Sequence, residues 1–158
     1  MQDDLTGPGA TLAQEQQLAQ ALLLLLRQEQ QGLIEADTDV VMSLLAEKSR
    51  LVASLRPLAA AREQALLNAG HPVSDKGMQA WLAGAKASAA LRLLWSTLME
   101  TSRSAREMNR INGLLIHRHM LRNQAALEVL QGRPAHSNVY GPNGQTTQRQ
   151  QSRSRVIG

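Results

Sequence analysis

The chain has 158 residues, and its composition excludes several classes of protein. It has no cysteine, which excludes disulfides, thiol nucleophiles and cysteine-based zinc sites. The aromatic residues that favour strands amount to two Trp, one Tyr and no Phe, whereas helix-favouring Leu, Ala, Gln, Glu and Arg are abundant. The net charge of +4 is uneven, since residues 1–100 hold 8 basic and 11 acidic side chains and residues 101–158 hold 9 arginines and 2 acids. The sequence therefore predicts an all-α protein with a basic C-terminal part.

The chain is predicted to begin with a disordered lead-in, residues 1–10, which is polar and contains a Gly-Pro-Gly sequence. This segment is acidic, unlike the basic start of a signal peptide. The apolar run from Ala21 to Leu26 is far shorter than the about 20 residues of a membrane span. We therefore expect no stable membrane insertion, and the lack of cysteine suits a reducing cytoplasm.

A first helix is predicted from an N-cap at Thr11 to about Ala36. Its apolar residues recur every seven positions, a spacing that keeps one seam facing a partner helix. The members of this repeat are Leu12, Ala19, Leu26, Leu33 and Val40. The aspartates at Asp37 and Asp39 supply capping side chains and predict a break there.

A second helix is predicted over residues 39–69, with a kink near Ala53 because Pro57 removes a backbone donor. Its seam also has a seven-residue spacing, widened by neighbouring apolar residues. The seam consists of Leu44, Leu51 and Leu58, with Val41, Leu45, Val52 and Leu55 beside it. A turn follows over residues 68–75, with a helix-ending glycine and a new cap at Ser74 or Asp75.

After a short helix ending near Gly84, a long helix is predicted from Lys86 to Gln131, about 69 Å at 1.5 Å per residue. We expect part of it to be a rod that folds back on the first two helices as an antiparallel coiled coil. Its seam is Leu91, Leu94, Leu98, Thr101, Ala105, Met108, Asn112 and Leu115. The seam turns polar at Asn112 and His119, which either fixes the register of the helices or leaves a place for another protein's helix.

The last segment, residues 133–158, has almost no apolar residues and is predicted to be a disordered tail following a helical domain over residues 11–132. It nevertheless contains the chain's one tyrosine, Tyr140, in the sequence NVYGPNGQT. Glycines at 141 and 144 allow tight turns that leave this ring projecting. The tail is therefore a candidate docking peptide.

Candidate chemical sites are weak. His117 and His119 lie two apart, which points them in different directions on a helix and disfavours a shared metal ion. Glu100 and Glu107 lie among arginines and are typical of surface ion pairs rather than of a catalytic carboxylate pair. We expect no catalysis, no metal and no cofactor.

Binding to protein is the favoured function, and two alternatives stay open. Arg103, Arg106 and Arg110 form a short basic stripe that would suit nucleic acid, but the arginine-rich part contains a single aromatic residue for base stacking. Alternatively, the leucine seam pairs with itself in a structural coiled-coil protein.

The chain resembles the FlgN family of bacterial flagellar export chaperones over about residues 12–145. The first helix resembles the family in Leu22–Leu26, Glu29, Leu33 and Asp37, and the second in Leu44, Glu47, Lys48, Leu51, Leu55 and Arg62. The long helix resembles it in Asn109, Asn112 and Leu115. The tail motif Tyr-Gly, two residues, Gly is present as Tyr140, Gly141 and Gly144.

The resemblance implies a non-catalytic cytoplasmic chaperone that acts transiently at the export apparatus. We expect it to be a monomer or weak homodimer. Its cargo would be hook–filament junction proteins such as FlgK and FlgL, each bound through a helical C-terminal segment. Its docking partner would be the cytoplasmic domain of the export gate protein FlhA, through Tyr140, Gly141 and Gly144. Cargo would bind the apolar positions Leu114, Leu115, Leu121, Leu127 and Leu130. The family pattern does not explain the extension after Gly144.

Overall fold

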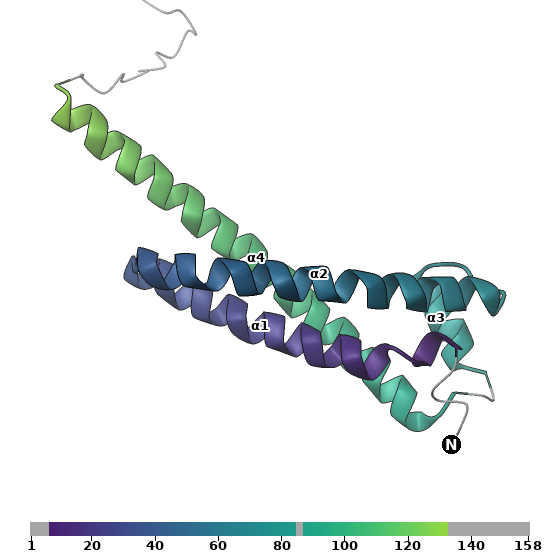
Figure 1. The fold of residues 1–158 in the computed structure, drawn as a ribbon. Coiled ribbons are helices and arrows are strands. Elements are labelled where there is room, and N and C mark those ends of the chain that lie inside the picture. Colours follow the sequence, from purple (N-terminus) through teal and green to yellow (C-terminus); the bar gives the residue numbers. More distant parts are fainter. Residues whose placement is uncertain (1–6, 85–86, 133–158) are drawn as a thin grey trace, which may run out of the picture. The chain divides into compact units, whose positions relative to one another are not determined.

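In a computed structural model, residues 7–84 and 87–132 of the chain are described, and within these ranges the protein is helical without a β-strand. The chain divides into two units, residues 1–119 and 120–158, and the last helix passes from one to the other. The elements are a 3-10 helix η2 (Gly7–Gly9), α1 (Leu12–Glu35), α2 (Thr38–Asn68), α3 (Asp75–Leu82) and α4 (Ala89–Leu130). The prediction of an all-α fold is confirmed (Figure 1).

The break between α1 and α2 forms where the aspartates predicted it. Ala36 adopts a left-handed conformation with φ of 55°, and its N–H reaches back to the last turn of α1. The carboxylate of Asp37 then accepts a hydrogen bond from the N–H of Val40 at 3.1 Å, which caps α2. Thr11 behaves differently from a predicted cap, because its hydroxyl donates to Glu15 at 2.7 Å and caps no backbone group.

The turn between α2 and α3 also follows the predicted chemistry. Gly70 has a positive φ of 81°, and the hydroxyl of Ser74 accepts a hydrogen bond from the N–H of Gly77 at 3.0 Å. A Cβ atom at Gly77 would lie 1.9 Å from the carbonyl oxygen of Pro72, so this position has no room for any side chain. Glycine here lets the turn close tightly onto the start of α3.

The start of the chain is more ordered than its composition predicts. Pro8 and Gly9 are buried, and a Cβ atom on Gly9 would lie 2.9 Å from Leu91 and 3.2 Å from Trp81. The predicted disordered lead-in is therefore wrong for residues 7–10. The physical reason is that a backbone without a side chain fits between α3 and the start of α4.

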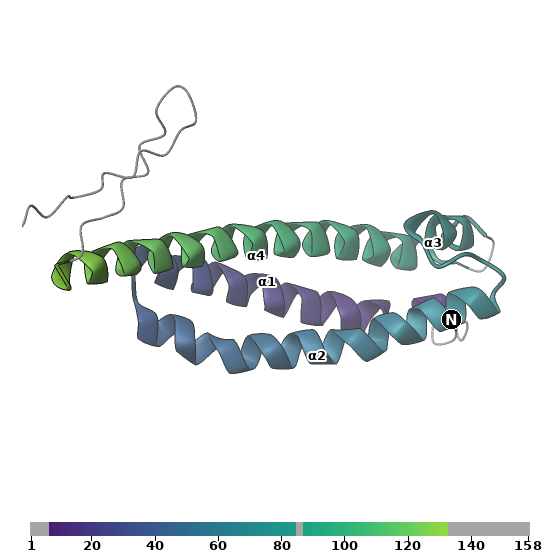
Figure 2. The ribbon, with the colours of Figure 1, turned by 90° about the horizontal axis from the view of Figure 1, so that it is seen from above.

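The helices of residues 7–119 pack around one hydrophobic core. It consists of Leu12, Ala19, Leu66, Met78, Leu82, Ala87, Leu91, Trp95 and Leu98. Contacts between side chains give the helix directions: α1 and α2 are antiparallel, and α4 is antiparallel to α2 but parallel to α1 (Figures 1 and 2). The predicted antiparallel packing of the long helix thus holds against α2, whereas α4 and α1 run in the same direction.

The predicted seams differ in how far they are buried. In α4 all eight predicted seam residues are buried or partly buried, and in α1 the repeat is buried from Leu12 to Leu33. Val40 is exposed because the chain has already turned at Ala36. In α2 only Leu51 and Leu66 are fully buried.

The predicted burial of the residues beside the α2 seam is therefore wrong for two of them. Leu45 and Val52 are exposed, because a helix with partners on one side cannot bury so wide an apolar stripe. The helix continues through Pro57, and the kink near Ala53 stays a prediction.

Candidate functional site

A first buried ion pair joins three helices near the start of α1. The carboxylate of Glu15 is almost completely buried, and the Nε of Arg62 on α2 lies 3.1 and 3.2 Å from its two oxygens. The guanidinium of Arg62 also lies 5.1 Å from the ring centroid of Trp95 on α4. A carboxylate buried in this way is tolerated only because it is paired and hydrogen-bonded. The pair therefore fixes α1, α2 and α4 relative to one another.

A second polar contact joins the same three helices further along. The ammonium of Lys48 lies 3.0 Å from Glu29, and the side-chain amide of Asn112 donates to the same carboxylate at 2.7 Å. That amide also donates to the carbonyl oxygen of Leu26 at 2.9 Å. Asn112 is 1% exposed, so this polar residue of the α4 seam makes its hydrogen bonds within the protein rather than with a partner. Buried polar pairs of this kind select one helix register, because a shifted register leaves them unsatisfied.

His119 extends this pattern toward the end of α1. Its Nε2 donates to the carbonyl oxygen of Leu33 at 2.7 Å, whereas His117 is exposed. The two imidazoles thus have different surroundings, as their spacing predicts. Within residues 7–84 and 87–132, no three His, Cys, Asp or Glu residues are grouped so as to hold a metal ion.

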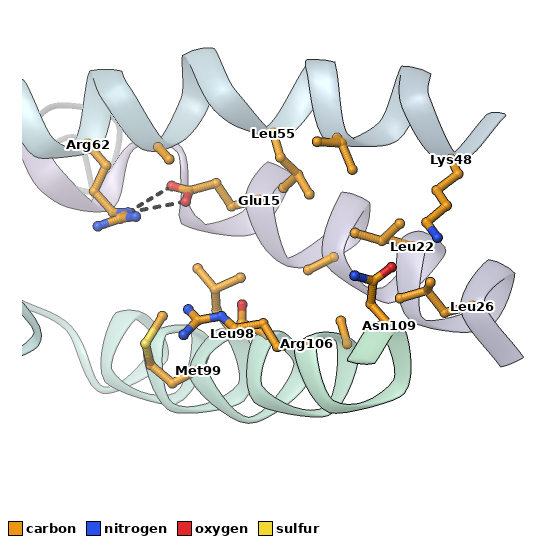
Figure 3. Close-up of a pocket in the computed structure, with 15 residues that line it drawn as sticks. Glu15, Leu22, Leu26, Lys48, Leu55, Arg62, Leu98, Met99, Arg106 and Asn109 are labelled. Carbon is orange, nitrogen blue, oxygen red and sulfur yellow. Dashed lines mark hydrogen bonds and ion pairs between the residues drawn. The ribbon is translucent and has the colours of Figure 1, made fainter. Parts of the chain in front are cut away.

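An open groove lies between the two polar contacts, with a volume of about 390 Å³. Three helices contribute one stripe each, with side chains repeating at three- and four-residue intervals. The stripes are Glu15, Ala19, Leu22 and Leu26 on α1; Lys48, Val52, Leu55, Ala59 and Arg62 on α2; and Leu98, Met99, Ser102, Ala105, Arg106 and Asn109 on α4. Figure 3 shows the lining residues Leu22, Leu55 and Leu98, one on each of the three helices that surround the groove.

Of the two α4 carboxylates expected to form surface ion pairs, Glu107 forms one. Glu107 pairs with Arg110 at 2.7 Å, and this guanidinium holds the pKa of the Glu107 carboxyl below its ordinary value. Glu100 is exposed. Glu107 therefore belongs to a solvated ion pair, as its arginine neighbours predict.

The predicted cargo positions lie at the end of α4, and most are exposed. Leu114 is exposed, whereas Leu115 is partly buried as a member of the seam. Leu121, Leu127 and Leu130 are 54%, 56% and 83% exposed. Met120 and Val129, which lie in the same apolar region between Leu114 and Leu130, are also exposed. The predicted docking residues Tyr140, Gly141 and Gly144 lie outside the described residues.

The fold and these surfaces define a class of protein: an all-α helical bundle with an apolar groove and an apolar helix end. None of the described helices is long and apolar enough to cross a membrane. A sequence model of the FlgN protein family matches residues 4–148, and the chain therefore belongs to the FlgN family of flagellar export chaperones. The family resemblance predicted from the sequence is thus confirmed. No curated protein and no solved structure matches the chain.

Proposed function

We propose that this protein is a cytoplasmic export chaperone that binds a helical C-terminal segment of a hook-associated protein such as FlgK or FlgL. It then delivers this cargo to the flagellar export gate. Membership of a family of flagellar export chaperones supports the general role. The observation that carries the proposal is the apolar surface exposed at the end of α4. The function requires binding and release of protein, and we assign no catalytic step to it.

The end of α4 offers apolar side chains in two sectors of the helix. Ile116, Met120 and Leu127 lie along one sector at helical spacing, and Leu114 and Leu121, seven residues apart, lie along another. An amphipathic cargo helix would remove part of this surface from water, a gain of about 25 cal/mol per Å². The same burial would cover the cargo's own apolar stripe and prevent premature assembly.

The tail is the proposed contact with the export gate. Tyr140 supplies the aromatic anchor, and Gly141 and Gly144 supply the turns around it, as in the tail motif of the family. The partner would be the cytoplasmic domain of an FlhA-like gate protein. Cargo and gate would then bind separate surfaces of one chaperone, which we expect to be a monomer or a weak homodimer.

The test separates the two surfaces. We expect Leu127→Asp to weaken binding of a purified FlgK-like C-terminal segment, because a charge would be placed in the buried contact. We expect Tyr140→Ala to keep cargo affinity and to lower export in cells. Affinity measured by calorimetry and secreted junction protein measured by blotting provide the two readouts. Loss of cargo binding in Tyr140→Ala, with gate docking intact, would overturn the proposal that cargo and gate bind separate surfaces.

The nucleic-acid alternative is less well supported than protein binding. Arg110 of the basic stripe is paired with Glu107, which reduces the positive charge available for phosphate contacts. Retention of the protein on nucleic acid at moderate salt would revive this alternative.

A further inference from the structure

We propose that the groove between α2 and α4 is a second docking site, which takes an acidic amphipathic helix of a protein partner. This site lies within residues 15–109 and is separate from the proposed cargo surface at the end of α4. It goes beyond the proposed function, because neither cargo binding at α4 nor gate docking through the tail uses it.

The lining of the groove has the form of a receptor for a helix. Its floor is buried and includes Ala19, Leu26 and Leu98, and its walls are the partly exposed Leu22 and Leu55. Small and branched apolar side chains in three parallel or antiparallel stripes leave a trough that follows the helix direction. A helix laid in such a trough places residues at i, i+3, i+4 and i+7 against it.

The groove has a definite length because polar contacts occupy its ends. The α2 stripe runs from Lys48 to Arg62, which is about 21 Å at 1.5 Å per residue. The α4 stripe from Leu98 to Asn109 is about 16 Å by the same measure. An occupant would therefore be a helix of three to four turns, about 11 to 14 residues.

The charge of the rim indicates the chemistry of the occupant. Arg106 lines the groove from α4 and also lines an adjoining cavity of about 470 Å³, to which Arg103 and Arg110 contribute together with the acidic Asp75 and Glu107. Neither Arg103 nor Arg106 forms an ion pair with another residue of the described part of the chain. On the opposite rim the cations Lys48 and Arg62 are paired internally. An apolar trough edged by the Arg106 guanidinium, with Arg103 close by and neither paired within the described residues, fits a helix that carries carboxylates beside its apolar stripe.

The same charge argues against the chain's own segments as occupants. Residues 133–158 contain four arginines and no acidic residue, a composition that does not complement a basic rim. The apolar end of α4 in a second copy also carries Arg118 and Arg122. A separate acidic partner is therefore favoured over either form of self-occupation.

Binding of designed peptides to the full chain tests the proposal. The probe is a fluorescent peptide of about 14 residues with leucines at i, i+3, i+4 and i+7 and glutamates elsewhere. Its controls are the same peptide with lysine in place of glutamate and a scrambled peptide of equal composition. Fluorescence anisotropy should show binding of the acidic amphipathic peptide alone. Equal binding of the acidic and basic peptides would overturn the charge argument.

Matched variants locate the site. Arg106→Glu should weaken binding about tenfold, whereas Arg27→Glu, an equal charge change at an exposed position of α1 outside the lining, should have little effect. Val52→Asp should likewise weaken binding, whereas Leu45→Asp, also exposed on α2 but outside the lining, should not. Equal effects within either pair would place the peptide elsewhere and overturn the proposal.

A photo-crosslinker identifies the occupant directly. Benzoylphenylalanine at Ser102, which lines the groove, should crosslink the acidic peptide, and the same group at the exposed Ser104 should not. Crosslinks from Ser102 to residues 133–158 or to a second copy would instead make the groove a site of self-occupation and overturn the proposal. Failure here leaves the cargo experiment on Leu127 unaffected, so the two proposals fail separately.

Discussion

The two parts of α4 use polar and apolar residues in opposite ways. From Leu91 to Asn112 the seam is buried or partly buried, and even its polar members, Thr101 and Asn112, are hydrogen-bonded to α1. Beyond His119, which meets Leu33 near the end of α1, leucines are exposed. The comparison teaches that residue type alone does not predict the surroundings of a side chain here: the polar Asn112 is buried between helices, whereas the apolar Leu121 and Leu127 are exposed to solvent.

The largest expected difference is in stability. Leu98 is 3% exposed in the core, and Leu98→Ala should lower the free energy of unfolding by about 2–5 kcal/mol. The matched change Leu127→Ala removes the same atoms from an exposed site and should cost less than about 0.5 kcal/mol. Urea unfolding followed by circular dichroism measures both. A similar loss in the two variants would mean that the end of α4 is as tightly packed as its start.

A smaller effect is expected from the buried amide. Asn112→Ala removes both donors from Leu26 and Glu29 and should destabilise the protein by about 1–3 kcal/mol. Asn109→Ala, one turn away and exposed, is the matched control and should be nearly neutral. Should the Asn112 variant unfold at the same urea concentration as the wild type, the polar contact would not be what fixes the register.

The smallest effect concerns the exposed pair on α4. Arg110 lowers the pKa of Glu107, first through its hydrogen bond, so Arg110→Gln should raise that pKa toward its ordinary value. Because the folded-state pKa is lowered, any stabilisation is present at neutral pH and is lost as the pH falls through that pKa. NMR titration of the Glu107 side chain measures the shift. Glu47, whose pKa is similarly lowered by Arg50, is the internal control. An unchanged Glu107 titration would show that the pair does not form in solution.

Much of the fold could be predicted because its causes are local or periodic. The seam of α4, the cap at Asp37 and the cap at Ser74 follow from spacing and short-range hydrogen bonding. The burial of Gly9 could not be predicted, since it depends on a gap between Trp81 and Leu91 that forms only when distant helices meet. Likewise, the exposure of Val52 depends on which side of α2 lacks a neighbour.

The candidate site was harder to predict than the fold. The family motif identified Arg62 and Lys48 by position, but their roles as partners of Glu15 and Glu29 depend on contacts between helices. The groove is lined by one stripe from each of three helices. Each stripe alone looks like an ordinary amphipathic helix face, so none of them predicts a groove. The charge of its rim could not be predicted either, because it depends on Arg106 having no ion-pair partner within residues 7–84 and 87–132.

The contact of the N-terminal glycines with α3 has a spectroscopic consequence. The chain has two tryptophans, Trp81 beside Gly7 and Gly9, and Trp95 beneath the guanidinium of Arg62. Detachment of the first turn would expose one indole, whereas loss of the buried ion pair would expose the other. Emission spectra of Trp81→Phe and Trp95→Phe variants would therefore follow the two events separately, without any attached dye.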